Sequence, residues 1–570
     1  MAGNMCQDAG DEGTILNIMY SNKDNVNILT SQLVGYGVRH AVVCPGSRNA
    51  PIVHNLNTHP QIACHAVTDE RSAAFYAIGL CLATDSPVVV CVTSGSALMN
   101  VAPAVVEAMY QHLPLIVISA DRAPQWIGQQ DGQTMPQHGA LQQFVRHSVS
   151  LPEPSNDEQR WYCRRLVNEC LVACRKGCGA PVHINVPISE PLFDFTVSTL
   201  SEAHVVRFVD PGVQAGNIGE MMRELLSAER PMLVVGQANN EHFCEEDIRL
   251  LSQKMVIARE PLSTSYVERC PIDMAVSAIS GQKDYQPDFL LYVGDAIVSK
   301  NLKHFLRRCD GCREWIVNAD GAFYDTFTHL SGIVQAHPAD ILRHIAQAAD
   351  TFDAADRRQS FLRMWQELLQ KCCDKIDSHV PSYSQLMAVK HFEQLIDTLD
   401  MPHSVHYANS MVVRLGSLFA RHHIFCNRGV NGIEGSLSTA CGYSLASDGR
   451  AFCVTGDLSF FYDSNALWQQ ELKDNLRVLL INNGRGAIFG NLKGLELSPA
   501  REKLVSASHE ADAKGVCRQN NITYLTAADA AELDCRLRQF VFGESDRPML
   551  LEVFTDADVD STEFRQIMEV

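Results

Sequence analysis

The stretch that decides the fold is Ala451–Asn483, AFCVTGDLSFFYDSNALWQQELKDNLRVLLINN. An apolar run of strand length, Ala451–Thr455, stops at Gly456-Asp457, and a second run, Arg477–Ile481, stops at Asn482-Asn483. A helix-compatible segment, roughly Ser464–Lys473, lies between them. The pattern predicts two parallel strands joined by a helix, with a carboxylate at the end of one strand and an amide at the end of the next.

In an open α/β sheet, ligands bind at the carboxyl ends of the strands. Asp457 and Asn483, 26 positions apart, can meet there on one cation that prefers oxygen ligands, which suits Mg²⁺. A pyrophosphate would then lie on the cation and on the N–H groups that begin the intervening helix. The arrangement resembles the metal-diphosphate motif of thiamine-diphosphate (ThDP) enzymes. Ordinary α/β proteins also place Gly-Asp and Asn-Asn at strand ends. Whether this chain is a ThDP enzyme therefore depends on the rest of its sequence.

Composition limits the classes of protein that fit. The chain has 570 residues, enough for about three domains, and a formal net charge of −19, which argues against nucleic acid or an anionic membrane as partner. Its beginning, MAGNMCQDAGDEG, has no apolar core, and no run approaches the ~18 apolar residues of a membrane span, so we expect no signal peptide and no membrane insertion. The 20 cysteines are scattered through apolar or helical contexts, which predicts mostly buried free thiols in a reducing, cytoplasmic compartment. Cys309-Asp-Gly-Cys312 fits a turn with two incidental cysteines better than a redox motif.

Strand and helix patterns alternate along the whole chain. Near-continuous β-branched runs such as PVVVCVT (Pro87–Thr93) and LPLIVIS (Leu113–Ser119) predict parallel sheets covered on both faces. We predict three doubly wound α/β domains, at 1–200, 205–375 and 380–570. Polar residues follow the strands of the first and last domains, whereas the central domain has few apart from the loop Asp295–Lys300. This layout resembles ThDP enzymes, in which one outer domain binds the aminopyrimidine and the other binds the diphosphate.

ThDP chemistry needs one carboxylate beside the aminopyrimidine, where it hydrogen-bonds the ring and promotes removal of the C2 proton. DERSAAFYAIGLCLA (Asp69–Ala83) supplies Glu70 in a loop before a helix expected at Ala73–Ala83. Acidic residues in a first turn also complement a helix dipole, so the residues alone leave both interpretations open. The resemblance of this segment to the ThDP pattern favours Glu70 as the activating glutamate.

Three further segments resemble the MenD family of menaquinone biosynthesis, the 2-succinyl-5-enolpyruvyl-6-hydroxy-3-cyclohexene-1-carboxylate synthases. They are CPGSRNAP (Cys44–Pro51), TSGSALMNVAPAVVEA with SADRAP (Thr93–Ala108, Ser119–Pro124) and NRGVNGIEGSLSTACG (Asn427–Gly442). ANSMVVR (Ala408–Arg414) and INNGRGAIF (Ile481–Phe489) add to the resemblance. It implies a transferase that decarboxylates 2-oxoglutarate on ThDP and adds the succinyl unit to isochorismate in a 1,4-addition. It also implies a homodimer or homotetramer, because the family builds its site from two subunits.

The resemblance assigns roles residue by residue. Glu70 is the catalytic residue, and Mg²⁺, with Mn²⁺ as a plausible substitute, is held by Asp457, Asn483 and the carbonyl of Arg485. The cofactor-binding residues it implies are Glu70, Ser94, Gly95, Ile433, Gly456, Asp457, Leu458, Ser459, Asn483, Ile488 and Phe489. Both substrates are dicarboxylic acids, which the bidentate guanidinium of arginine suits. The substrate-binding residues it implies are Ser47, Arg48, Arg122, Gln133, Lys300, Ser410, Arg414 and Arg428.

Two departures from the family pattern matter. Arg485 stands within the usual glycine-rich turn after Asn-Asn, where its side chain could crowd the metal, and Asn301 follows Lys300 where many members have a second cation. The nearest alternative is another ThDP-dependent 2-oxoacid decarboxylase or carboligase, of the acetohydroxyacid-synthase type. A non-catalytic ThDP-fold subunit is a further alternative, although such a protein would be expected to have lost Glu70, Asp457 or Asn483. A plain nucleotide-binding fold is weaker, since no strand is followed by G-x-G-x-x-G.

Overall fold

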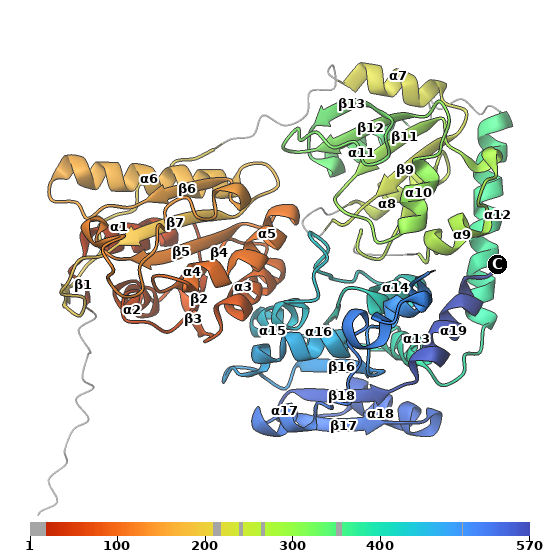
Figure 1. Ribbon diagram of the computed structural model, residues 1–570. Helices are drawn as coiled ribbons and strands as arrows, with labels where there is room; N and C mark the ends of the chain where they lie inside the picture. Colours follow the sequence, from red (N-terminus) through yellow and green to blue (C-terminus); the bar gives the residue numbers. More distant parts are fainter. Residues whose placement is uncertain (1–18, 209–217, 239–242, 264–267, 349–355, 493) are drawn as a thin grey trace, which may run out of the picture.

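The computed structural model describes residues 19–208, 218–238, 243–263, 268–348, 356–492 and 494–570. The opening residues, on which the expectation about a signal peptide rested, lie outside these ranges. Three parallel sheets follow one another along the chain, each with helices packed against it (Figure 1). The predicted class, α/β with doubly wound parallel sheets, is therefore confirmed. We refer to the three sheets with their helices as the first, central and last blocks.

The first block contains a six-stranded sheet in the order β3-β2-β4-β5-β7-β6. A separate antiparallel pair joins β1 and β8. The strands are β1 (Tyr20–Ser21), β2 (His40–Val43), β3 (Ala63–Ala66), β4 (Val88–Val92), β5 (Leu115–Asp121), β6 (His147–Ser150), β7 (Val182–Pro187) and β8 (Phe195–Val197). The helices are α1 (Asp24–Gly35), α2 (Ala50–Thr58), α3 (Glu70–Thr84), α4 (Ala97–Asn100), α5 (Ala102–Tyr110) and α6 (Asp157–Arg175), with 3₁₀ turns η1 (Pro124–Trp126) and η2 (Gln142–Phe144).

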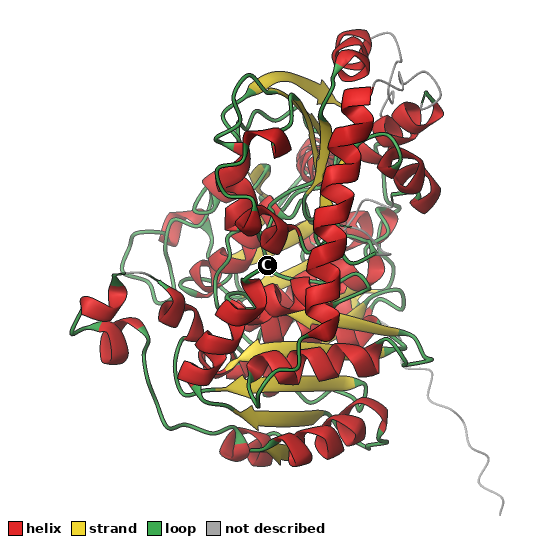
Figure 2. Cartoon of the chain, turned by 90° about the vertical axis from the view of Figure 1, so that its right-hand side faces the viewer, coloured by secondary structure: helices red, strands yellow, loops and turns green. Residues whose placement is uncertain are grey.

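The central block has a five-stranded sheet in the order β10-β9-β11-β12-β13. Its strands are β9 (Pro231–Val235), β10 (Val256–Arg259), β11 (Phe289–Val293), β12 (Arg313–Asn318) and β13 (Leu330–Gln335). Its helices are α7 (Gly219–Ser227), α8 (Glu245–Ser252), α9 (Ile272–Ala278), η4 (Lys283–Tyr285), α10 (Lys300–Leu306), α11 (Pro338–Gln347) and α12 (Asp356–Ser378). The long helix α12 runs along the outside of the molecule from the central block toward the last one (Figure 1), and the side view of Figure 2 faces it.

The last block has a five-stranded sheet in the order β14-β15-β16-β18-β17. Its strands are β14 (His403–Tyr407), β15 (Arg450–Gly456), β16 (Leu476–Asn482), β17 (Thr523–Ala527) and β18 (Met549–Phe554). Its helices are α13 (Gln385–Ile396), α14 (Met411–Phe419), α15 (Ser436–Ala446), α16 (Asp457–Tyr462), α17 (Lys514–Gln519), α18 (Ala530–Phe542) and α19 (Ala557–Met568). Shorter helical turns are η6 (Ser464–Leu467), η7 (Ala487–Asn491), η8 (Leu495–Leu497) and η9 (Arg501–Val505).

Several local expectations are corrected by the structure. The helix expected at Ser464–Lys473 is wrong: α16 begins at Asp457 itself, and only the single turn η6 follows. The Asp463 carboxylate accepts hydrogen bonds from the N–H and hydroxyl of Ser438, each at 2.8 Å, which ties the end of α16 to α15 instead of letting the helix continue. After β4 the chain forms two short helices, α4 and α5, instead of one continuous helix, because Pro103 cannot donate the hydrogen bond that a continuous helix needs there.

The hydrophobic cores are shared between blocks. One buried cluster combines Phe75 and Tyr76 of α3 with Leu437 of α15 and Leu480 of β16. Another combines residues of α12 with the helices and strands of the last block, Trp365 and Phe392 among them. Because apolar contact is continuous across these boundaries, the blocks are held together by core packing as well as by polar contacts.

Helices α3 and α15 cross at two glycines and join the first block to the last (Figure 1). A Cβ on Gly79 would lie 2.0 Å from the carbonyl oxygen of Thr439, and one on Gly442 would lie 2.1 Å from that of Tyr76. Both distances are far inside van der Waals contact, so the two backbones can only approach this closely with glycine at both positions.

The cysteines of the described residues are free thiols, and most of them are buried. Cys244 and Cys535 are the exposed ones within those ranges. Burial raises the pKa of thiols such as Cys91 and Cys426 to about 12, which keeps them protonated and unreactive. In the described part of the chain no helix is both long enough and apolar enough to span a membrane.

Candidate active site

The strand ends of the last sheet bring Asp457 and Asn483 together. Strands β15 and β16 are neighbours and parallel, so their carboxyl ends lie at the same edge. Asp457, the first residue of α16, is 3% exposed. Its Oδ2 accepts the backbone N–H of Asn483 at 3.1 Å and its Oδ1 accepts that of Leu458 at 2.7 Å. Burial raises the pKa of this carboxyl, and a bound cation would favour its ionised form.

The turn after β16 is held in a defined shape. Gly484 has φ +73°, which favours glycine, and the backbone N–H of His509 donates to its carbonyl at 2.8 Å. The guanidinium of Arg485 forms ion pairs with Glu502 and Asp558. The arginine that departs from the family pattern is therefore neutralised by two carboxylates and directed toward η9 and α19.

His509 is a site residue that the sequence did not suggest. Its Nδ1 accepts the backbone N–H of Ala511 at 3.1 Å, which leaves Nε2 as the donor. That Nε2 is buried without a hydrogen-bond partner among the described residues and lies 3.6 Å from Asp457 Oδ2. An orphaned donor beside a buried carboxylate fits a site that takes an oxygen-rich anion together with a cation.

The donor set can hold the metal and cofactor that the sequence implies. One carboxylate, one amide and one backbone carbonyl are oxygen ligands, the kind that Mg²⁺ and Mn²⁺ take. Ile433 is 40% exposed although it is apolar, and the hydroxyl of Ser459 donates to its carbonyl at 2.5 Å. This hydrogen bond holds Ile433 close to Ser459, two residues after Asp457. An exposed isoleucine there fits a surface that a cofactor ring would cover. Gly456 and Leu458 flank the carboxylate.

The short helix η7, which carries two of the predicted cofactor-binding residues, directly follows the turn after β16. Ile488 and Phe489 belong to it, and both are partly buried. A Cβ on Gly486 would lie 2.8 Å from the ring of Phe489, so a glycine is needed for the ring to pack there.

Glu70 lies at the beginning of α3, and its place differs from the one expected. It is the first residue of the helix, not part of a preceding loop, and Asp69 caps the helix by accepting the N–H of Ser72 at 3.1 Å. The side chain of Asn100, at the end of α4, donates to Glu70 Oε2 at 3.0 Å. Asn100 was missed because a lone amide at a helix end carries no sequence signal.

Ser94 and Gly95 follow β4 at the same edge as Glu70. Gly95 has φ +84°, and a Cβ there would lie 3.2 Å from the backbone of Gln133. Its N–H donates to the side chain of Gln137 at 2.6 Å. The tight turn therefore brings backbone N–H and carbonyl groups close to Gln133, which is exposed.

In the first block the structure brings Arg48 and Arg122 together. Arg48 is buried, donates to the carbonyl of Ile188 at 3.0 Å, and pairs with Glu190 at 3.2 Å. Arg122 lies 3.6 Å from the same carboxylate oxygen and also pairs with Asp131. Ser47, next to Arg48, is exposed. The side chain of Glu190 is 70% exposed, so a carboxylate ligand could compete with it for the two guanidinium groups.

A second cationic cluster lies where the last and central blocks meet. Burial and the charge of Arg428 lower the pKa of Arg414 and of Lys303, while the carboxylate of Glu260, joined at Arg414 by that of Asp273, partly offsets the shift. Lys303 was not predicted: it lies one turn after Lys300 on α10, and Lys300 itself is exposed. A bound dianion would stabilise cations that burial partly removes from water.

One loop, Cys426–Ile433, carries Arg428 and receives a hydrogen bond from every block. Glu107 of α5 accepts the N–H groups of Gly429 and Val430 at 2.7 and 2.8 Å. Gln237, after β9, donates to the carbonyl of Cys426 at 2.8 Å. Asn409, after β14, donates to the carbonyls of Asn427 and Gly432 and accepts from Arg428 at 3.0 Å. The three blocks thus fix the position of Arg428 jointly.

Ser410 has φ +75°, a conformation that a serine rarely adopts. It precedes α14, the helix that carries Arg414. Strained backbone next to buried ligand-type residues is common at binding sites. Arg48 with Arg122 and Arg414 with Arg428 form two separate pairs on different blocks, so the structure groups the predicted substrate residues into two clusters.

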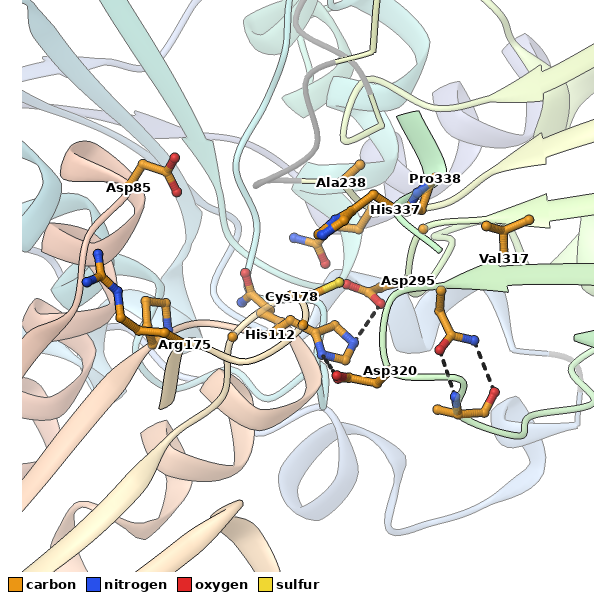
Figure 3. Close-up of a pocket in the computed structure, with 18 of the residues that line it drawn as sticks. Asp85, His112, Arg175, Cys178, Ala238, Asp295, Val317, Asp320, His337 and Pro338 are labelled. Atoms are coloured by element: carbon orange, nitrogen blue, oxygen red, sulfur yellow. Dashed lines mark hydrogen bonds and ion pairs between the residues drawn. The ribbon is translucent and has the colours of Figure 1, made fainter. Parts of the chain in front are cut away.

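A further cavity, of about 250 Å³, lies between the first and central blocks (Figure 3). His112 lies 3.1 Å from Asp295 and 3.9 Å from Asp320 across this boundary. Although burial lowers the pKa of His112, its hydrogen bond and the charge of Asp295 raise it overall. None of the predicted site residues lines this cavity, and its ion pairs join the two blocks.

Comparison with known proteins gives two family matches. Residues 25–148 match the family described as "Thiamine pyrophosphate enzyme, N-terminal TPP binding domain", and residues 409–553 match "Thiamine pyrophosphate enzyme, C-terminal TPP binding domain". The matched ranges contain Glu70 and the pair Asp457 and Asn483.

Curated relatives match over nearly the whole chain. A protein of Bacteroides thetaiotaomicron is 41% identical over 95% of this chain and 98% of its own length, and one of Phocaeicola vulgatus is 42% identical over 96% and 98%. A protein of Porphyromonas gingivalis is 32% identical over 94% and 95%. Each of the three is named 2-succinyl-5-enolpyruvyl-6-hydroxy-3-cyclohexene-1-carboxylate synthase.

Proposed function

The chain belongs to the family of 2-succinyl-5-enolpyruvyl-6-hydroxy-3-cyclohexene-1-carboxylate synthases, ThDP-dependent enzymes of menaquinone biosynthesis, and from this we propose its reaction in detail. It decarboxylates 2-oxoglutarate and joins the remaining succinyl unit to isochorismate by 1,4-addition. Bound ThDP supplies the electron sink that the decarboxylation requires. The protein's own contribution is to hold the cofactor and orient two polyanions.

The observation that carries the choice of substrates is the cluster of Arg414, Arg428 and Lys303. These three cations are partly removed from water, and the carboxylates of Asp273 and Glu260 offset only part of their charge, so the cluster can accept a further anion. A dicarboxylic acid neutralises them and recovers the cost of their burial. A monocarboxylic substrate, which the acetohydroxyacid-synthase alternative would use, leaves part of that charge unpaired.

We assign the other residues as follows. Glu70 would activate bound ThDP by hydrogen-bonding its aminopyrimidine ring, with Asn100 orienting the carboxylate. Asp457, Asn483 and the Arg485 carbonyl hold Mg²⁺ or Mn²⁺, and the first block keeps Arg48 and Arg122 for the second carboxylic acid. Domain boundaries at about residues 200–205 and 375–380 remain part of this proposal, as does a cytoplasmic location, which the free thiols favour.

We further propose that the enzyme is a homodimer or homotetramer. Exposed apolar side chains near α3, α15 and α16 support this, among them Met99, Ile433, Tyr462 and Trp468. A second copy of the chain covering them would exclude water from the cofactor. Sedimentation equilibrium measures the state directly, and a monomer at micromolar concentration contradicts it.

The reaction is tested by following isochorismate absorbance after adding protein, Mg²⁺ and ThDP, with and without 2-oxoglutarate. Loss that requires both 2-oxoglutarate and ThDP is the expected result. If isochorismate persists while 2-oxoglutarate releases CO₂, the acceptor is wrong. If pyruvate replaces 2-oxoglutarate with equal efficiency, the acetohydroxyacid-synthase alternative is correct. If ThDP binds and neither substrate is consumed, the chain is a non-catalytic subunit.

A further inference from the structure

The beginning of the C-terminal helix α19 contacts the Asn483–Gly490 turn at three points. Asp558 pairs with the guanidinium of Arg485, and Asp560 accepts a hydrogen bond from the side chain of Asn483 at 2.9 Å. Ser561 packs against Gly490, where a Cβ would lie 2.5 Å from its hydroxyl oxygen. The helix that ends the chain therefore supports the turn that follows β16.

Asp560 is fully buried and has three hydrogen-bond donors around it. Its Oδ1 accepts the backbone N–H of Gln385 at 2.7 Å, and its Oδ2 accepts the hydroxyl of Thr555 at 2.7 Å as well as the Asn483 amide. All three neighbours donate to Asp560, which is the arrangement that suits an ionised carboxylate, since such a group only accepts hydrogen bonds.

The contact decides which way the amide of Asn483 points. An asparagine side chain has one donating and one accepting end. Next to a partner that only accepts hydrogen bonds, the amide nitrogen must face that partner. The oxygen then faces the opposite side, toward the turn at Arg485. Within the described residues that oxygen has one backbone contact, with the N–H of Arg485 at 3.4 Å, which is long for a hydrogen bond.

We propose that Asp560 is a positioning residue of the metal–diphosphate site, which fixes the Asn483 amide so that its oxygen faces the cation. The inference rests on the proposed function, because it assumes that Asp457 and Asn483 hold a cation with ThDP. It adds a residue 77 positions away from Asn483 to that site. Partners that orient a metal ligand typically contribute about 10- to 100-fold to metal affinity.

The substitution Asp560→Asn tests the orientation with almost no change in volume. The new amide must keep its oxygen toward the N–H of Gln385 or toward Asn483, and cannot accept at both places. When its nitrogen faces Asn483, the Asn483 side chain must turn over and direct its own nitrogen at the cation. The matched control is Asp556→Ala, which removes the cap of the same helix, where Asp556 accepts the N–H groups of Asp558 and Val559.

The measurement is Mn²⁺ binding in the presence of ThDP, followed by loss of the electron paramagnetic resonance signal of free Mn²⁺, with the melting temperature recorded in parallel. We expect Asp560→Asn to weaken Mn²⁺ binding by about 10- to 100-fold. Asp556→Ala should lower the melting temperature and leave Mn²⁺ binding within about threefold of the unsubstituted protein.

The outcomes separate this inference from the proposed function. If the unsubstituted protein does not bind Mn²⁺ with ThDP, the proposed function fails whatever Asp560 does. If it binds and Asp560→Asn binds equally well, or if Asp556→Ala loses as much affinity, the positioning role is refuted. The double substitution Asn483→Asp with Asp560→Asn restores the hydrogen bond with donor and acceptor exchanged. It should recover Mn²⁺ binding relative to Asp560→Asn, and no recovery also refutes the role. If Asp560→Asn alone does not fold, binding by the double variant within about tenfold of the unsubstituted protein supports the role, and its absence refutes it.

Discussion

The crossing of α3 and α15 gives the sharpest prediction. In Gly442→Ala the new methyl carbon starts 2.1 Å from the carbonyl oxygen of Tyr76, whereas ordinary contacts begin at 3.4 Å. Because the obstacle is backbone, no side-chain rotation relieves it, and the helices must separate by about 1.3 Å at this point. Glu70 lies on the same helix as Tyr76, so the shift is carried to the carboxylate that we propose activates the cofactor.

The cost can be bounded from the structure. Overpacking of this kind costs about 1–3 kcal/mol, and the upper end applies because both partners are main chain. Alanine recovers about 1 kcal/mol of helix propensity relative to glycine, which leaves a net loss of about 2 kcal/mol. For a domain of this size the melting temperature should fall by about 4–8 °C. A displacement of about 1 Å at a catalytic group costs about 100-fold in kcat/KM.

The assay compares three proteins by calorimetry and by isochorismate consumption. Gly515→Ala is the matched control, since nothing lies within 4 Å of its Cβ position in α17 of the same block. We expect Gly442→Ala to lose stability and activity, and Gly515→Ala to keep both. A Gly442→Ala protein with unchanged melting temperature would refute the close-contact argument. Unchanged activity despite a lower melting temperature would refute the coupling to Glu70.

Three further predictions follow from the site and its surroundings. Glu70→Gln should abolish turnover while ThDP binding, measured by tryptophan fluorescence, stays detectable; near-normal activity contradicts the assignment. Arg485→Gly should keep Mg²⁺ affinity, measured by tryptophan fluorescence, within about threefold, because the guanidinium is already paired with Asp558 and Glu502. A larger loss shows that the charge of Arg485 acts at the metal. Although His422 is buried, which lowers its pKa, the charge of Glu393 raises that pKa to about 9, above the unfolded value near 6.5. The ion pair therefore stabilises the fold fully below pH 6.5, and this stabilisation is lost as the pH rises through 9. His422→Gln should therefore lower the melting temperature more at pH 6 than at pH 9.5, and an equal effect at both contradicts the pair.

Several strands could be predicted from sequence because apolar runs mark them, although β18, which is buried between β16 and β17, was not among them. Strands β4, β5, β15 and β16 are near-continuous apolar runs, because both faces of a central parallel strand are buried. The strands β3, β6 and β13 were missed. They lie at sheet edges, and their residues are partly exposed, so no apolar run marks them.

The same distinction holds for the site. Asp457 and Asn483 follow recognisable strands directly, so parallel pairing alone predicted that they meet. Asp560 and Glu107 reach the site from helices that are distant in sequence, and only tertiary packing reveals them. Lys300 was predicted and Lys303 was not, because the sequence did not show where α10 begins. One helix turn separates the exposed Lys300 from the half-buried Lys303.

The distribution of thiols has a practical consequence for spectroscopy. Cys244 lies at the beginning of α8 in the central block, and Cys535 lies on α18 in the last block. They are the exposed cysteines of the described residues, while burial protects most of the others from maleimide reagents. A donor and an acceptor dye placed on these two native side chains would report by energy transfer on movement of the central block relative to the last. Addition of each substrate in turn would then show whether the two blocks close on their ligands.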